Sequence, residues 1–146
     1  MPTRNATAEW KGDLQQGSGT VSLGSGAWSG AYSFTSRFEN GSGTNPEELI
    51  AAAHAGCFSM ALANMLSSAG HPPTRVRTVA KVHIEKQGDG FAIPRIELET
   101  EGEVPGMDEA TFRRHAENAK AGCPVSKVLA GAEISLKTRF LEPASA

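Results

Sequence analysis

The chain has 146 residues and a formal charge of −2, with acidic and basic residues interspersed along it. This length fits a single domain, residues 1–146, with one hydrophobic core. The sequence contains neither a basic field for nucleic acid nor a polybasic run for an anionic membrane, so we expect neither as a partner. The N-terminus lacks the apolar stretch of a secretory signal, and we therefore expect a cytoplasmic protein.

Residues 3–38 are rich in glycine and contain no long helical pattern. Their short apolar runs carry residues such as Trp10 and Trp28, and each run is bounded by glycines. This pattern predicts a β-meander. Arg37 and Phe38 are expected in the last strand of that meander.

A long helix is predicted from Asn45 to about Ala69. Asn45 suits the N-cap and Pro46 the first helical position, and Gly70-His-Pro-Pro73 would end the helix. The stretch is apolar on nearly every side, but it is interrupted by polar residues and is of minimal length for a membrane span. We therefore expect it to be buried at the centre of a globular protein or of an oligomer.

Two strands with a shared outer face are predicted next. Residues 74–87 and 95–103 alternate apolar and charged side chains, and Gly88-Asp-Gly90 reads as a hairpin turn between them. The outward charges have opposite signs on the two strands. We interpret them as a solvated face held by cross-strand pairs and not as a binding site.

Two helices and a strand complete the chain. Asp108 caps a helix that runs to about Ala121, Pro124 opens a short helix, and residues 133–140 alternate as a closing strand. The whole predicts an α+β fold with antiparallel strands around a long buried central helix. One short chain covers such a helix poorly, so we expect an obligate homodimer in which two copies wrap around each other.

Cys57 and Cys123 are the only cysteines. A lone buried cysteine is usually a small hydrophobe. Two thiols in a reducing compartment, however, favour a transient redox couple or a metal site over a permanent disulfide. A thiolate in an apolar helix needs a cation, and Arg37 oriented by Glu47 is the candidate, although an ordinary Arg–Glu surface pair explains the same residues.

Two segments closely resemble the OsmC/Ohr family of thiol peroxidases, and the likeness runs from Trp10 to Phe140. The first segment, residues 36–62, contains Ser-Arg-Phe, Asn-Pro-Glu-Glu-Leu and Ala-His-Ala-Gly-Cys. The second, residues 119–129, contains Ala-Gly-Cys-Pro-Val-Ser. The resemblance implies an intertwined α+β homodimer that reduces organic hydroperoxides, and less efficiently hydrogen peroxide, in oxidative or osmotic stress defence.

The resemblance also implies a role for each site residue. Cys57 would be the peroxidatic cysteine, Cys123 the resolving cysteine, and Arg37 with Glu47 the pair that governs the thiolate. The resulting disulfide would be reduced by an external dithiol, with dihydrolipoyl groups as the favoured donors, and no cofactor would be bound. Glu47 and Cys57 are ten positions apart, about 15 Å along a helix. Either the helix kinks sharply or the Arg–Glu pair comes from the partner subunit, and we favour the partner subunit because no proline is present to cause a kink.

Three alternatives remain open at this point. His54 and Cys57 share a helix face, which permits a metal site with Cys123 and His71. A Cys–His hydrolase is weaker, because nothing resembles an oxyanion loop. A redox-sensing protein, in which the disulfide is a switch, would use the same two cysteines without turnover.

Overall fold

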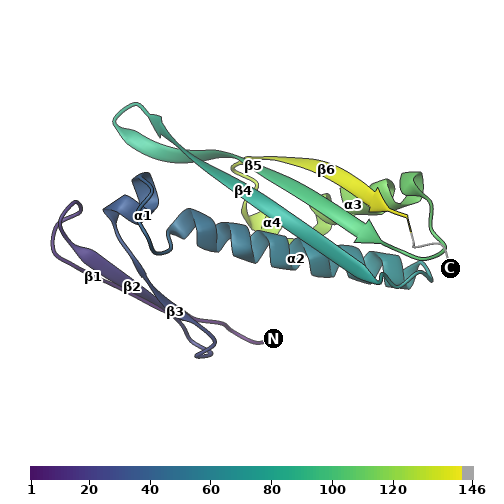
Figure 1. Cartoon of the computed structure of the whole chain (residues 1–146), viewed down its shortest axis with the longest axis horizontal. Coiled ribbons are helices and arrows are strands. Elements are labelled where there is room, and N and C mark those ends of the chain that lie inside the picture. Colours follow the sequence, from purple (N-terminus) through teal and green to yellow (C-terminus); the bar gives the residue numbers. More distant parts are fainter. Residues whose placement is uncertain (143–146) are drawn as a thin grey trace. The chain divides into compact units, whose positions relative to one another are not determined.

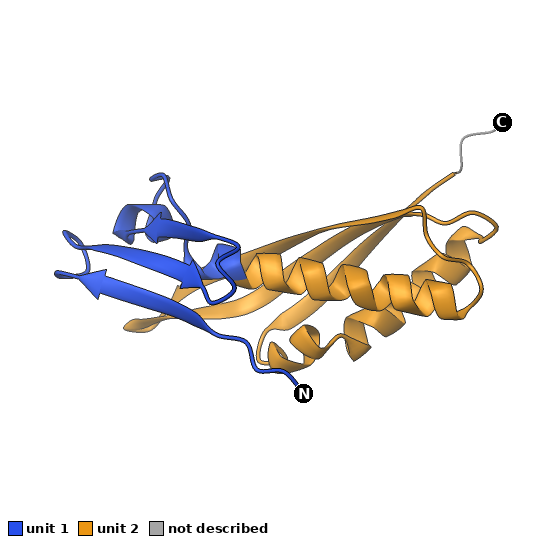
Figure 2. Ribbon diagram, turned by 90° about the horizontal axis from the view of Figure 1, so that it is seen from below, with its two compact units in different colours: residues 1–49 blue, residues 50–146 orange. Residues whose placement is uncertain are grey.

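The computed structural model describes residues 1–142, so the last four residues of the expected domain lie outside the described part. Two compact units divide the chain, the first ending at Leu49 and the second beginning at Ile50 (Figure 2). Each unit has its own sheet, and the boundary falls inside a long helix. The expectation of one domain spanning 1–146 stays a prediction.

The first unit contains the predicted meander. Strands β1 (Ala6–Lys11), β2 (Ser18–Leu23) and β3 (Ser29–Tyr32) form an antiparallel sheet in the order β1-β2-β3 (Figure 1). Gly19 lies between Trp10 and Tyr32 in this sheet, and a Cβ at Gly19 would lie 2.4 Å from the Tyr32 ring. The glycine therefore lets the two rings pack over the strand, with centroids 5.3 Å apart.

The segment Phe34–Phe38 is a short helix, α1, and not the last strand of the meander as predicted. The reason is a capping box between two serines. The Ser33 side chain accepts a hydrogen bond from the Ser36 amide, and the Ser36 side chain accepts one from the Ser33 amide at 2.8 Å. Arg37 therefore lies in the last turn of a helix.

The predicted long helix is α2 (Pro46–Ser68). The Asn45 side chain accepts a hydrogen bond from the Glu48 amide at 2.8 Å, as expected for an N-cap, and Gly70 with φ of +89° follows the end of the helix. By length and composition α2 would also pass for a membrane-spanning helix, a property that core helices of soluble proteins share.

The described residues bury one side of α2. His54, Phe58, Leu62 and Leu66, spaced four residues apart, have no exposed surface. On the opposite side Met60 is 76% exposed. The helix that the sequence places at the centre of the protein is therefore a half-covered helix in a single chain.

The second unit has a three-stranded sheet in the order β4-β5-β6, formed by Arg75–Gln87, Gly90–Glu103 and Glu133–Leu141. The hairpin β4–β5 is antiparallel as predicted, but β6 pairs in parallel with β5. The chain between β5 and β6 passes through α3 (Glu109–Gly122) and α4 (Pro124–Val128). This crossover returns the chain to the sheet in the direction of β5.

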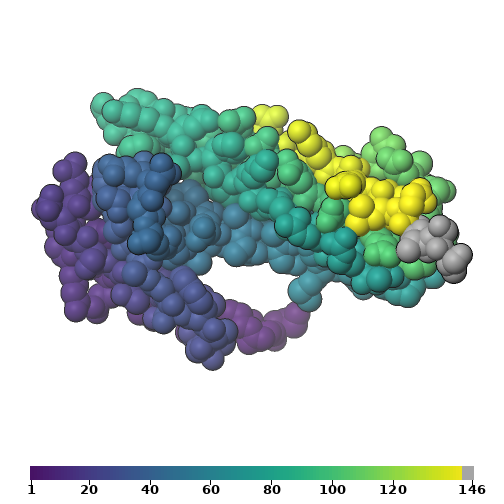
Figure 3. Space-filling model, viewed as in Figure 1, coloured from purple at the N-terminus to yellow at the C-terminus, as the bar shows by residue number. Residues whose placement is uncertain are grey.

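The core of the second unit lies between the sheet and its helices, which cover one face of it (Figure 2). Phe58 and Leu62 of α2 pack there with Leu98 of β5 and with Phe112 and Ala116 of α3. The other face of the sheet lies at the surface, from teal β4 to yellow β6 in Figure 3.

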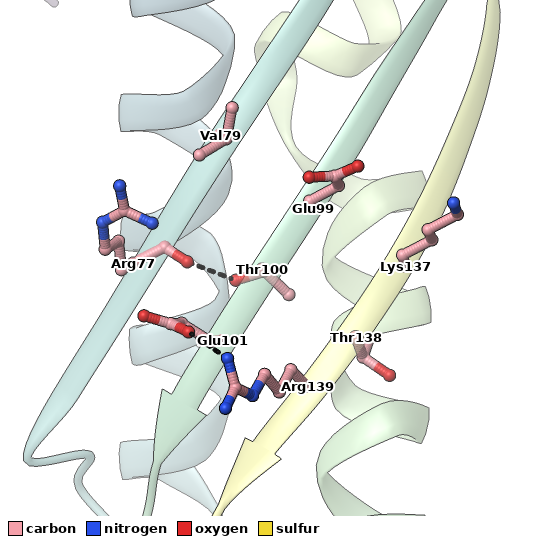
Figure 4. Close-up of a pocket in the computed structure, with 8 residues that line it drawn as sticks. All are labelled: Arg77, Val79, Glu99, Thr100, Glu101, Lys137, Thr138 and Arg139. Carbon is pink, nitrogen blue, oxygen red and sulfur yellow. Dashed lines mark hydrogen bonds and ion pairs between the residues drawn. The ribbon is translucent and has the colours of Figure 1, made fainter.

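The outer face of this sheet carries the expected cross-strand charge pairs. Lys81 binds Glu99 at 3.0 Å, and Glu101 lies 3.1 Å from Arg75 and 3.8 Å from Arg139. A shallow hollow on this face is lined in part by charged side chains. Glu101 of the central strand β5 lies in it between β4 and β6 (Figure 4). Opposite charges alternate across the face, so it presents no single sign to a ligand.

Gly102 of β5 provides a test of this core. A Cβ at Gly102 would lie 2.4 Å from the Phe112 ring, which is fully buried, so Gly102→Ala should lower the free energy of unfolding by about 1–3 kcal/mol. Gly90→Ala in the same strand meets nothing within 4 Å and should change it by less than about 0.5 kcal/mol. Urea unfolding at one protein concentration measures the free energy of unfolding of both variants. Equal effects would contradict the close packing of Gly102 against Phe112.

Candidate active site

The two cysteines of the second unit lie side by side. Cys57 is on α2 and Cys123 is in the junction between α3 and α4, and their sulfur atoms are 2.9 Å apart. Both are free thiols, and Cys123 is fully buried whereas Cys57 is partly exposed. The two thiols, which are 66 positions apart in the sequence, are thus brought into contact, and their role as a redox couple stays a prediction.

Local signals explain where Cys123 lies. Its amide donates to the Ala119 carbonyl at 2.9 Å, which ends α3, and Pro124 then begins α4 as the sequence predicts. Ala116 and Ala119 of α3 are buried in the same core cluster as Phe58. Because Phe58 follows Cys57 in α2, the packing of these helices brings the two thiols together.

Burial raises the pKa of the Cys57 thiol, and the hydrogen bond with Cys123 raises it further. Burial also acts to raise the pKa of Cys123, but hydrogen bonds from the Cys57 thiol and from Ser126 outweigh it and lower that pKa. Within one chain these surroundings therefore disfavour the thiolate of Cys57 and favour that of Cys123. A Cys57 thiolate needs an additional cation or hydrogen-bond donor.

A second polar pair lies next to the thiols. His54 Nε2 and Ser126 Oγ are 2.7 Å apart, and both side chains are buried. Among residues 1–142, His54 Nδ1 has no hydrogen-bond partner, and burial lowers the pKa of the imidazole. Sequence reasoning gave Ser126 no role, although its position three residues after Cys123 at the start of a helix was a usable signal.

The open metal hypothesis involved His54 with both cysteines and His71. Within residues 1–142, no group of three or more His, Cys, Asp or Glu side chains is placed to hold a metal ion. The imidazole of His54 is engaged instead with the Ser126 hydroxyl.

Arg37 and Glu47 form a two-pronged ion pair in the first unit, as the sequence predicted. Arg37 Nη2 lies 2.8 Å from Glu47 Oε1, and Arg37 Nε lies 3.2 and 3.3 Å from the two carboxylate oxygens. The Glu47 side chain is only 6% exposed, whereas that of Arg37 is 35% exposed. The carboxylate therefore fixes a guanidinium that keeps part of its surface free for a ligand.

The same guanidinium borders an aromatic hollow in the first unit. Its lining includes Trp10, Leu14, Tyr32, Phe34 and Phe38. The guanidinium carbon of Arg37 lies 5.2 Å from the centre of the Phe38 ring. A cation beside an apolar wall suits a ligand that has one polar end and one organic end.

Comparison with known proteins shows a family likeness along most of the chain. The family model described as OsmC-like protein matches residues 39–139, a span that includes Glu47 and both cysteines and begins after Arg37. The peroxiredoxin OsmC of Escherichia coli strain K12 is 53% identical over 134 residues, which cover 91% of this chain and 93% of that protein.

Solved structures share the fold. The organic hydroperoxide resistance protein of Elizabethkingia anophelis superposes with a TM-score of 0.73 at 27% identity, covering 98% of each chain. The crystal structure of OhrB of Bacillus subtilis gives a TM-score of 0.72 at 22% identity, covering 92% of this chain and 98% of that one. The predicted α+β fold is confirmed by this likeness.

The buried imidazole makes a prediction about stability. The pKa of His54 is lowered from 6.5 in the folded chain, so the unfolded chain binds a proton first as the pH falls. The stability contributed by the neutral imidazole is complete above pH 6.5 and is lost below it, by at most about 1.4 kcal/mol per pH unit.

Urea unfolding between pH 7 and pH 5.5 would measure this loss. His54→Gln, which does not titrate, should show a weaker decline than the wild type over this range. An equal decline in the wild type and in His54→Gln would contradict the assignment.

Proposed function

This chain belongs to the OsmC-like protein family, and we propose that it is a cysteine-based peroxidase that reduces organic hydroperoxides, and less efficiently hydrogen peroxide, to alcohols. The observation that carries the proposal is the 2.9 Å separation of the Cys57 and Cys123 sulfurs. The name of the Escherichia coli relative, a peroxiredoxin, supports it.

In the proposed cycle Cys57 is the peroxidatic residue. Its thiolate attacks one peroxide oxygen, the O–O bond breaks, and the alkoxide takes up a proton and leaves as an alcohol. The sulfenic acid on Cys57 then condenses with Cys123, which forms the disulfide and releases water. An external dithiol, of which a dihydrolipoyl group is the favoured type, reduces the disulfide and restores both thiols.

We also propose that the active protein is a homodimer with composite sites. A second copy would cover the exposed side of α2, on which Met60 is 76% exposed. It would also supply the cation that Cys57 requires, because burial raises the pKa of that thiol. The Arg37–Glu47 pair of the second copy is the source of that cation, since Glu47 and Cys57 of one helix lie about 15 Å apart along its axis.

The aromatic hollow beside Arg37 supports the preference for organic hydroperoxides. An alkyl or aryl group that buries about 100 Å² there would gain roughly 2.5 kcal/mol, a gain that hydrogen peroxide lacks. Arg37 at the edge of the hollow would offset the negative charge that develops on the peroxide oxygens.

We place this activity in the cytoplasm, in defence against oxidative or osmotic stress. A reversible thiol couple suits a compartment in which thiols are kept reduced. Both cysteines of the chain are free, and each is assigned a step in the cycle.

Separate substitution of the two cysteines tests the proposed function. Cys57→Ser should abolish hydroperoxide consumption, because no thiolate attacks the peroxide. Cys123→Ser should consume about one equivalent and then stall as a sulfenic acid that is prone to further oxidation. Peroxide consumption with an excess of dithiol measures the first effect, and peroxide consumption together with thiol counts in the absence of dithiol measures the second. Sustained turnover by the Cys57→Ser variant would show that the assignment is wrong.

Mixed dimers test the composite site. Cys57→Ser chains co-refolded with Glu47→Ala chains should regain activity, because one site per heterodimer then combines an intact Cys57 with an intact Glu47. As a control, Cys57→Ser chains mixed with Cys123→Ser chains should not regain sustained turnover, since both cysteines of a site belong to one chain. If heterodimers of the first kind form and remain as impaired as their parents, the two subunits do not share a site.

A further inference from the structure

We propose that Ser126 and His54 position the resolving cysteine. The Ser126 hydroxyl, itself held by His54, donates a hydrogen bond to the Cys123 sulfur and keeps that sulfur aimed at Cys57 while the disulfide forms. This inference rests on the proposed peroxidase cycle and assigns a role to two residues that the cycle does not otherwise use.

Two contacts join α2 to the segment from Cys123 to Ser126. His54 precedes Cys57 by one helical turn on α2, and Ser126 follows Cys123 by three residues in α4. The sulfur pair is 2.9 Å apart and the imidazole–hydroxyl pair is 2.7 Å apart. The second contact therefore fixes the start of α4 against α2 at the place where the two thiols must meet.

Packing alone does not explain why the His54–Ser126 pair is buried. His54 has no exposed surface and Ser126 is 4% exposed, and the described part of the chain offers no hydrogen-bond partner to the buried His54 Nδ1 atom. An unsatisfied buried polar atom destabilises a fold, and an apolar side chain at position 54 would extend the row of Phe58, Leu62 and Leu66 without that cost. The polar pair needs an explanation other than packing.

The protonation state of His54 sets the direction of the hydrogen bonds. Burial lowers the pKa of the imidazole, so His54 is neutral and carries one N–H. With the proton on Nε2, the imidazole donates to Ser126 Oγ, and the Ser126 hydroxyl hydrogen remains free for Cys123. With the proton on Nδ1, a donor would be buried unsatisfied and the hydroxyl would turn toward the imidazole instead.

Cys123 shows the effect of this arrangement. Burial acts to raise its pKa, yet hydrogen bonds from Cys57 and from the Ser126 amide and hydroxyl lower it overall. A neutral His54 with a lowered pKa is a poor proton acceptor, so the imidazole orients Ser126 and does not remove the proton from Cys123.

The step that benefits is the closure of the disulfide. The Cys123 sulfur attacks the Cys57 sulfenic sulfur, the S–S bond forms and the S–O bond breaks. The proton of the Cys123 thiol goes to the departing oxygen, which leaves as water. The Cys123 sulfur is oxidised and the Cys57 sulfur is reduced, so the step needs no further reagent.

The test separates the two steps of the cycle in the full chain. Each variant is mixed with one equivalent of cumene hydroperoxide. Oxidation of Cys57 is followed by trapping the sulfenic acid with dimedone, and disulfide closure by mass spectrometry after alkylation. Ser126→Ala should oxidise Cys57 at the wild-type rate but close the disulfide about tenfold more slowly, with more dimedone adduct, because a hydrogen bond to the attacking sulfur is lost.

Conservative variants and a surface control are measured alongside Ser126→Ala. Ser126→Thr keeps the hydroxyl and should restore closure, and His54→Gln keeps an N–H near the position of Nε2 and should close faster than His54→Leu. Ser135→Ala changes an exposed serine of β6 and should alter neither rate. If Ser126→Ala does not fold, His54→Leu takes its place. We expect it also to oxidise Cys57 at the wild-type rate and to close the disulfide more slowly.

Each outcome decides one of the two proposals. A wild-type protein whose Cys57 is not oxidised would overturn the proposed function. Wild-type closure in both Ser126→Ala and His54→Leu would overturn the positioning role while leaving the peroxidase intact. An equal fall in both rates would also overturn it, because that is the mark of a general disturbance of the fold.

Discussion

The packing of one face of α2 against β5 and α3 is the contact on which the site depends. Phe58, Leu62 and Leu66 lie on this face with no exposed surface, and they share a core with Leu98 and Phe112. Because Cys57 adjoins Phe58 in the chain, the same packing holds its sulfur at the margin of the core. Cys123, at the end of α3, is carried to it by the same contacts. The contacts that form the core therefore also place the two thiols, so a change in this packing would move the sulfur atoms.

The same apolar setting creates an electrostatic requirement. Burial raises the pKa of Cys57, which opposes the thiolate that a peroxidatic residue needs. The first unit contains a guanidinium already oriented by a buried carboxylate, in the pair Arg37–Glu47. A guanidinium held in this way loses little freedom when it meets a ligand or a thiolate, which makes it an effective source of positive charge. The one-sided burial of α2 and the need for this cation both favour assembly with a second copy.

The charged face of the β4-β5-β6 sheet and the two cysteines lie on different sides of the protein. On the outer face of the sheet, Lys81 and Arg75 are paired with Glu99 and Glu101, so charges of both signs alternate and largely offset each other. The cysteines lie instead on the helical side of the sheet, among apolar side chains. There hydrogen bonds from Cys57 and from the Ser126 amide and hydroxyl help to lower the pKa of Cys123 despite its burial, because little water competes with them.

Local signals determined much of the fold. Asn45 with Pro46 marked the start of the long helix, Asp108 that of α3, and Gly88 the hairpin, because caps and turns depend on neighbouring residues. The paired cysteine motifs also indicated the family, and with it Arg37, Glu47, Cys57 and Cys123. The capping box at Ser33 was local too, but the aromatic residues around it suggested a strand.

Only the tertiary structure decided the remaining features. The parallel pairing of β6 follows from the path of the crossover, and the half-covered state of α2 follows from how much of it a single chain can reach. The contact between His54 and Ser126 joins residues 72 positions apart, and no periodicity in the sequence encodes such a distance. Local patterns specify which segments form helices and strands, whereas contacts between distant residues depend on how those segments pack.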